Sequence, residues 1–189
     1  MEQNNQPLVG EVVSQNPPSS YTGSPIARPR YHAFTLLLVG VNIAVYVAMV
    51  LGGVSAFSPT VQNLQHWGAM YGPAFAAGQR WRLVTSAFVH IGLIHIAFNM
   101  WCLWYLAELS ETIFGGWTTV AIYILTAMTS ALLSVMWHPM VTSAGASGAI
   151  FGLAGAIIIA LRIGNHHVPQ LVRRGISNSA FRFALYNLI

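Results

Sequence analysis

The sequence predicts an all-α protein, a bundle of several membrane-spanning helices, from its composition and from the spacing of its apolar runs. Of its 189 residues, 55% are hydrophobic and only 6% are charged, whereas soluble domains carry about 25% charged residues. The mean hydropathy is +0.59. So little charge would not keep so apolar a chain dispersed in water, and a soluble globular protein is therefore excluded.

The N-terminal segment, residues 1–30, is predicted to be a disordered tail. It holds five Pro and many Ser, Asn and Gln, without apolar periodicity, a composition that cannot bury enough surface to fold. The first long apolar stretch begins near Phe34, too far along the chain for a signal peptide. We expect residues 31–189 to form the membrane domain.

Four apolar stretches have the length that a bilayer requires, since about 20 residues at ~1.5 Å rise cross a ~30 Å hydrocarbon core. They are residues 34–51, 91–107, 117–137 and 144–161. Residues 52–82, rich in Gly, Pro and aromatics, are predicted to be irregular and to lie in or on the membrane interface. Residues 176–189 would reach only ~21 Å as a helix. We expect the chain to end within this fifth span.

Arginines orient the bundle, because short cytoplasmic loops collect basic residues. They flank the first and fourth predicted spans, at Arg28, Arg30, Arg162, Arg173 and Arg174. Both flanks then lie on one side, and the N terminus is predicted to be cytoplasmic. Arg80 and Arg82 fall on the opposite side, which indicates a local structural role.

The remaining composition gives little sign of partners other than lipid. The net charge of +4 comes from scattered Arg, so nucleic-acid binding has little support. The single Cys102 lies in an apolar run and is interpreted as a small buried hydrophobe. The oligomeric state is left open.

Polar residues inside the second predicted span are candidates for function, because lipid offers them no hydrogen-bond partners. His95 and Asn99 are four residues apart and share one helical face. The simplest interpretation is a pair of interhelical hydrogen bonds, each stabilising the bundle by about 0.6 kcal/mol.

The fourth predicted span begins with small residues around Ser147. Gly148, Gly152 and Gly155 form a stripe that lets a neighbouring helix approach closely, and Ser147 could be one more packing residue. Yet its hydroxyl is unshielded between Gly145 and Gly148, and its N–H belongs to the free donors of a helix start. Such a position suits a nucleophile beside donors for an oxyanion.

Taken together, these motifs resemble the rhomboid family of intramembrane serine proteases. The segment from Trp81-Arg82 through His90, His95, Asn99 and Met100 resembles the family's W-R…H…H-x-x-x-N-M pattern. Glu108 with Phe114-Gly115 is similar to its E…F-G element, and Gly145-Ala146-Ser147-Gly148 to its G-x-S-G motif. The matches extend over about residues 67–155.

The resemblance implies a rhomboid-like helical bundle that cleaves membrane-anchored proteins in or beside their transmembrane segments. It implies that Ser147 is the nucleophile, and that its N–H and the side chains of His95 and Asn99 form the oxyanion hole. Structural motif positions would be Trp81, Arg82, His90, Glu108, Gly145 and Gly148. No metal or organic cofactor is expected.

The family's general base is a His on a sixth span, which we expect to be absent from this chain. The sequence therefore leaves a second function open, a non-catalytic rhomboid-like protein that binds transmembrane segments. A metal site at His90 and His95 is disfavoured, because a spacing of five separates them by about 140° on a helix. No substitute base is expected from the other histidines, which are His32, His66, His138, His166 and His167. A transporter or channel is disfavoured because no Asp, Lys or Arg lies at the centre of a span.

Overall fold

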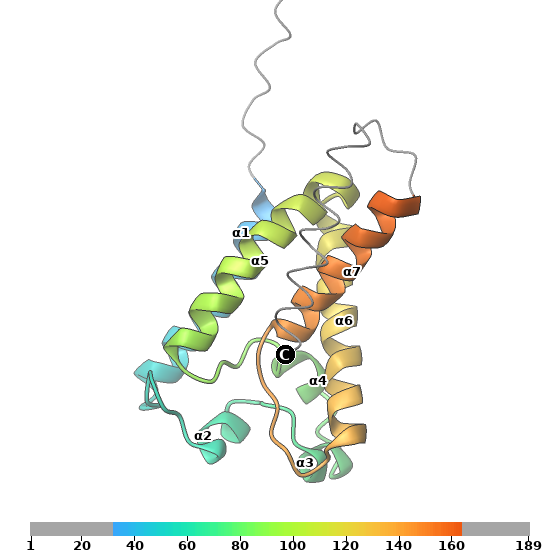
Figure 1. Ribbon diagram of the computed structural model, residues 1–189. Helices are drawn as coiled ribbons and strands as arrows, with labels where there is room; N and C mark the ends of the chain where they lie inside the picture. The colour runs from blue at the N-terminus through green and yellow to red at the C-terminus, as the bar shows by residue number, and fades with distance from the viewer. Residues whose placement is uncertain (1–31, 164–189) are drawn as a thin grey trace, which may run out of the picture. The chain divides into compact units, whose positions relative to one another are not determined.

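A computed structural model describes residues 32–163 as seven helices (Figure 1). In chain order they are α1 (Ala33–Leu51), α2 (Val61–His66), α3 (Gly72–Ala76), α4 (Arg82–Thr85), α5 (Leu93–Phe114), α6 (Gly116–Trp137) and α7 (Ser147–Ile163). The predicted tail, residues 1–30, and the predicted beginning of a fifth span, residues 176–189, lie outside the described residues. The all-helical architecture predicted from the sequence is confirmed for the described part.

Each of the four predicted spans coincides with one long helix, but two boundaries were wrong. The second helix, α5, runs seven residues past the predicted end at residue 107. The last, α7, begins at Ser147 instead of residue 144, because Gly145 has a φ of +122° and lies outside the helical region of backbone conformation. By length and apolar composition, α1 and α6 could cross a membrane, and α7 is a shorter apolar helix.

The prediction of an irregular stretch over residues 52–82 was also wrong in part, since α2 and α3 lie inside it and α4 begins at its end. Arg82 connects these short helices. Its Nη1 donates to the carbonyls of Gln65 and Ala69, each at 2.7 Å, and its Nε donates to Oε1 of Gln79 at 2.7 Å. The side chain therefore closes the loop on itself with three hydrogen bonds, which explains a buried cation there.

Helices α5 and α6 form a hairpin through a single residue, Gly115. Its φ of +83° is one that glycine adopts without steric cost, and it ends one helix and precedes the next. Close to this turn, the buried hydroxyls of Ser110 and Thr119 are 2.9 Å apart. The hairpin is thus fixed at its closed end.

Helices α6 and α7 pack closely because α7 presents glycines to α6. A Cβ added at Gly148 would lie 2.2 Å from Oγ of Ser130, and one added at Gly152 would lie 2.2 Å from Oγ1 of Thr126. These two glycines therefore let α7 lie against α6 at a distance that no larger residue allows.

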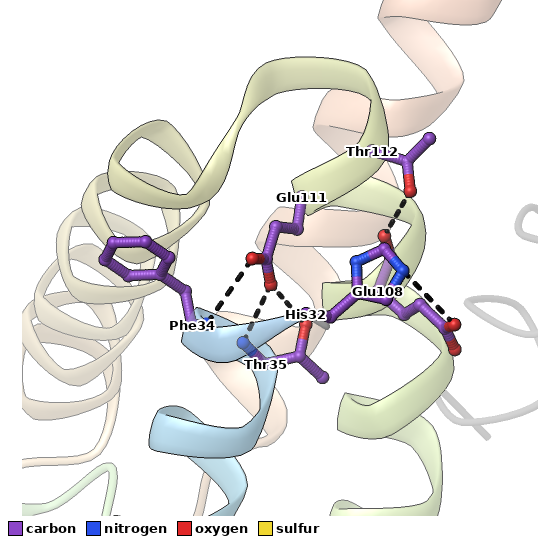
Figure 2. A network of polar contacts seen from close by, with 6 residues as sticks. All are labelled: His32, Phe34, Thr35, Glu108, Glu111 and Thr112. Carbon is purple, nitrogen blue, oxygen red and sulfur yellow. Dashed lines mark hydrogen bonds and ion pairs between the residues drawn. The ribbon is translucent and has the colours of Figure 1, made fainter. Parts of the chain in front are cut away.

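The start of α1 is joined to the end of α5 by a polar network (Figure 2). The residue before α1, His32, provides no side-chain cap. Glu111 supplies it instead, because its carboxylate accepts the N–H of Thr35 at 2.9 Å, the hydroxyl of Thr35 at 2.8 Å and the N–H of Phe34 at 3.4 Å. Nε2 of His32 also lies 3.5 Å from Oε1 of Glu108. A carboxylate at a helix start accepts hydrogen bonds from the free N–H groups and also interacts favourably with the positive end of the helix dipole.

Candidate active site

The loop before α7 is held by backbone hydrogen bonds to the loops that precede α5. Met70 and Ser143 exchange a pair of bonds, at 2.9 and 3.0 Å, and the N–H of Gly145 donates to the carbonyl of Ser86 at 2.9 Å. The N–H of Gly72 donates to the carbonyl of Pro139. These contacts fix where α7 begins, and so where Ser147 lies.

Ser147 is the first residue of α7 and is exposed. The N–H of Ile150 donates to the carbonyl of Ala146 at 3.0 Å as α7 begins, which leaves the N–H of Ser147 without a partner inside the helix. An accessible hydroxyl therefore sits beside a helix-start donor, where negative charge is favoured.

His95 lies in the first turn of α5, and its protonation pattern follows from one hydrogen bond. The N–H of Ile91 donates to Nδ1 at 3.2 Å, so a neutral ring carries its proton on Nε2. The opposite edge of the ring faces Gly145, because a Cβ added there would lie 2.6 Å from Cε1 and 3.0 Å from Nε2. The Nε2–H edge is thus aimed at the backbone just before Ser147.

Asn99 follows one turn later on the same face of α5 and is buried. Its Nδ2 donates to the carbonyl of His95 at 3.0 Å. A carbonyl only accepts, so the amide nitrogen faces it, and the second N–H of that group is left for another acceptor. The side chain is therefore both anchored and able to donate.

A single cavity of about 280 Å³ is lined by all three predicted site residues, Ser147, His95 and Asn99. Four further residues form the rest of its wall and were not predicted from the sequence, namely Phe98, Cys102, Ile150 and Phe151. Phe98 and Cys102 lie three and seven residues after His95, the helical spacing that could have revealed them. The arrangement offers a hydroxyl and hydrogen-bond donors to one small polar group.

A second cavity, of about 110 Å³, also opens on Ser147. Serine, alanine and glycine make up its whole wall, including Ser86, Ser130, Ser134, Ser143, Gly145 and Gly148. These serines were not predicted from the sequence, because they come from three separate segments that only the fold brings together. Among the described residues, His95 is the only imidazole that lines either cavity.

His90 is next to His95, and the expectation that helical spacing separates the two was wrong. His90 precedes α5, because Gly92, with a φ of +88°, interrupts the backbone before the helix starts. The two ring centroids are 5.4 Å apart. His90 is fully buried, its Nδ1 lies 3.0 Å from the carbonyl of Phe88, and its Nε2 has no protein partner.

Burial holds the pKa of His90 at about 4, against an ordinary value of 6.5. The hydrogen bond to Phe88 opposes this shift, and the nearby His95 adds to it. The folded protein favours the neutral imidazole. The contribution of His90 to folding stability is therefore complete above pH 6.5 and is lost as the pH falls towards 4.

We therefore expect acidification over this range to destabilise the protein by about 3 kcal/mol through His90 alone. The free energy of unfolding in micelles, measured against pH for the wild type and His90→Asn, checks this. The variant should show a shallower pH dependence, and identical slopes would contradict the assignment.

The other residues of the predicted motif lie outside both cavities or form their walls. Trp81 is half exposed in the loop before α4, where its ring lies 4.7 Å from the guanidinium of Arg82. Glu108 lies at the far end of α5 from His95, in the network at the start of α1. Glu111 was not predicted from the sequence, although its carboxylate accepts three hydrogen bonds there and Glu108 forms one ion pair.

The chain is similar to known proteins of one family. Residues 77–189 match the family described as the Rhomboid domain. The chain is 35% identical over 125 residues to "Rhomboid protease GluP" of Bacillus subtilis, covering 66% of this chain and 24% of that protein. It is 32% identical over 177 residues to "Rhomboid protease AarA" of Providencia stuartii, covering 83% of this chain and 60% of that protein.

One relative, from a plant, is named as inactive. The chain is 31% identical over 104 residues to "Inactive RHOMBOID-like protein 8" of Arabidopsis thaliana, which covers 54% of this chain and 30% of that protein. The chain thus spans at most about three fifths of the length of these three relatives.

The family match covers more than half of the chain, and apolar helices long enough to cross a bilayer accompany it. The chain therefore belongs to the rhomboid family and is an integral membrane protein.

Proposed function

We propose that this chain carries the nucleophile and oxyanion hole of an intramembrane serine endopeptidase. The observation that carries the proposal is a single cavity lined by Ser147, His95 and Asn99. Two relatives named as rhomboid proteases support the reaction class. The substrates would be membrane-anchored proteins.

In the proposed reaction, Oγ of Ser147 attacks the carbonyl carbon of a peptide bond and passes its proton to a base. The resulting oxyanion accepts hydrogen bonds from the N–H of Ser147, Nε2–H of His95 and the free N–H of Asn99. The C–N bond then breaks, the amine leaves with a proton, and water hydrolyses the acyl-enzyme. Removing one such donor lowers the rate by about 10²–10³-fold in serine proteases.

The length of α6 and its two exposed tryptophans support a membrane depth for Ser147. Trp117 and Trp137 are 78% and 80% exposed. They are 20 positions apart, and a helix rises ~30 Å over that separation, the thickness of the hydrocarbon core. Tryptophans favour both interfaces. Gly148 packs on Ser130, seven residues or ~10 Å before Trp137. Ser147 would thus act roughly 10 Å below the membrane surface.

The side of the membrane follows from the predicted orientation. The start of α1 meets the end of α5 through Glu111, so the start of α5, with His95, lies towards the opposite face. With the N terminus in the cytoplasm, as the arginines predict, cleavage would occur in the outer leaflet. Water would reach the site from the non-cytoplasmic side.

The second cavity indicates the kind of residue next to the cut bond. Its volume of about 110 Å³ and its wall of Ser, Ala and Gly leave room for a small side chain only. Hydroxyls in that wall can hydrogen-bond a polar substrate group. We infer a preference for a small residue at this position.

A second candidate function is a non-catalytic protein that binds transmembrane segments. It is favoured by the absence, among residues 32–163, of any imidazole other than His95 lining the cavities. A relative named as inactive also belongs to the family. A serine hydroxyl without a base is a weak nucleophile.

Labelling with a fluorophosphonate discriminates the two functions. The probe forms an O–P bond to an activated serine and releases fluoride. The full-length protein in membranes should be labelled on the peptide containing Ser147, as mapped by mass spectrometry, and Ser147→Ala should remove the adduct. An unlabelled wild type that still binds transmembrane peptides would support the binder and overturn the protease.

A further inference from the structure

The first turn of α5 is capped from outside the helix. Gly92 precedes the helix and has no side chain with which to cap it. The carbonyl of Ala56, in the loop after α1, accepts the N–H of Leu93 at 2.8 Å. A loop carbonyl therefore satisfies the first free donor of the helix that carries His95.

The same carbonyl accepts a second hydrogen bond, from α1. The hydroxyl of Tyr46 donates to it at 2.5 Å, and Tyr46 is only 8% exposed. A carbonyl oxygen has two lone pairs, and both are used here. Tyr46 thus holds the group that caps α5, although it touches neither cavity.

Close contact prevents the loop and the helix start from shifting independently. Gly92 has a φ of +88°, and a Cβ added there would lie 2.7 Å from the carbonyl oxygen of Phe57. The backbone at residues 56–57 therefore lies directly against the backbone at residue 92. Moving one displaces the other.

His95 depends on this same backbone. The N–H of Ile91, which sets the tautomer of His95, is two residues before Leu93, whose N–H is held by Ala56. His95 itself is the third residue of α5. The direction of its Nε2–H is thus set by a segment that Tyr46 anchors.

We infer that Tyr46 is a positioning residue for His95, acting through the carbonyl of Ala56. The effect of Tyr46 on cleavage rests on the proposed function, whereas its effect on the orientation of the His95 ring does not. Loss of the hydroxyl frees the carbonyl, loosens the cap on Leu93 and lets the imidazole leave its orientation. Tyr46→Phe removes only this hydroxyl.

A matched control exists in Tyr123. Its hydroxyl is also buried and accepts a hydrogen bond from Nδ2 of Asn42, at 3.1 Å, between α1 and α6. Tyr123→Phe therefore removes a buried, hydrogen-bonded hydroxyl without touching the start of α5. Any effect common to both variants is general destabilisation.

The first test needs no activity. In the full-length protein in micelles, ¹⁵N-edited NMR of the His95 ring should show a proton on Nε2 and none on Nδ1. Tyr46→Phe should mix the two tautomers, and amide exchange at Leu93 should be about fivefold to tenfold faster, as for one lost hydrogen bond. Tyr123→Phe should change neither. A Tyr46→Phe protein with the wild-type ring signals and Leu93 exchange would overturn the inference.

The second test uses cleavage of a membrane-anchored substrate. Tyr46→Phe should lower kcat by about 10- to 100-fold with KM unchanged, the size expected for a misplaced catalytic group, and Tyr123→Phe should leave kcat unchanged. Equal losses of kcat in both variants would show that Tyr46 only stabilises the fold and does not position His95. If Ser147→Ala cleaves as well as the wild type, the proposed function fails, and the NMR result still decides the positioning role.

Discussion

Replacement of Ser147 by alanine is expected to slow cleavage of a membrane-anchored substrate by about 10⁴-fold or more, because nucleophilic attack loses its reacting atom. The loss should lie in kcat. Alanine is a good helix former, and the serine hydroxyl is exposed, so stability should change little. Cleavage of a fluorogenic transmembrane peptide by the full-length protein, reconstituted in vesicles, measures this effect.

The matched control is Ser110→Ala. Ser110 also lies in a long helix, but its buried hydroxyl pairs with Thr119 near the hairpin turn, far from the cavity. This variant should lose about 1 kcal/mol of stability and retain cleavage within a few fold. Comparable cleavage by Ser147→Ala and the wild type would exclude Ser147 as the nucleophile.

Replacement of Gly145 by alanine is expected to lower cleavage by about 10²-fold or more while the bundle stays folded. A Cβ there would meet Cε1 of His95 at 2.6 Å, so the imidazole must move, and the rate loses an oxyanion donor. The φ of +122° adds backbone strain of about 1–3 kcal/mol. Cleavage rate and thermal unfolding should be measured on the same preparation.

Gly78→Ala is the control that separates backbone strain from displacement of the His95 ring. Gly78 has a φ of +95°, but a Cβ added there meets nothing within 4 Å. This variant should show the stability loss without the loss of cleavage. Were Gly145→Ala to cleave at the wild-type rate, His95 would have no part in oxyanion stabilisation at its present position.

The long helices were predictable because their signal is local. Apolar runs of bilayer length give the helices without any knowledge of their neighbours, as for α1 and α6. The end of α5 was not predictable in this way. The predicted span ended at residue 107, whereas α5 continues through Glu108 and Glu111, which meet the start of α1.

The site was predictable only where its residues share one helical face or one short motif. His95 and Asn99 are four residues apart on α5, and Ser147 lies two residues after Gly145, whose backbone stops the helix from starting earlier. The neighbour relation between His90 and His95 was misread, because helical spacing was applied across Gly92, where the backbone is not helical. Contacts between separate segments, such as the hydrogen bond from Tyr46 to the carbonyl of Ala56, produce no periodic pattern in the sequence.

The position of Cys102 gives the protein a built-in reporter of access to its interior. It is the chain's single cysteine, and its thiol forms part of the wall shared with Ser147. Because the side chain is otherwise buried, a maleimide or a spin label must enter through the cavity to react. Accessibility of that thiol therefore reports on entry into the cavity, without any engineered residue and without background from a second cysteine in this chain.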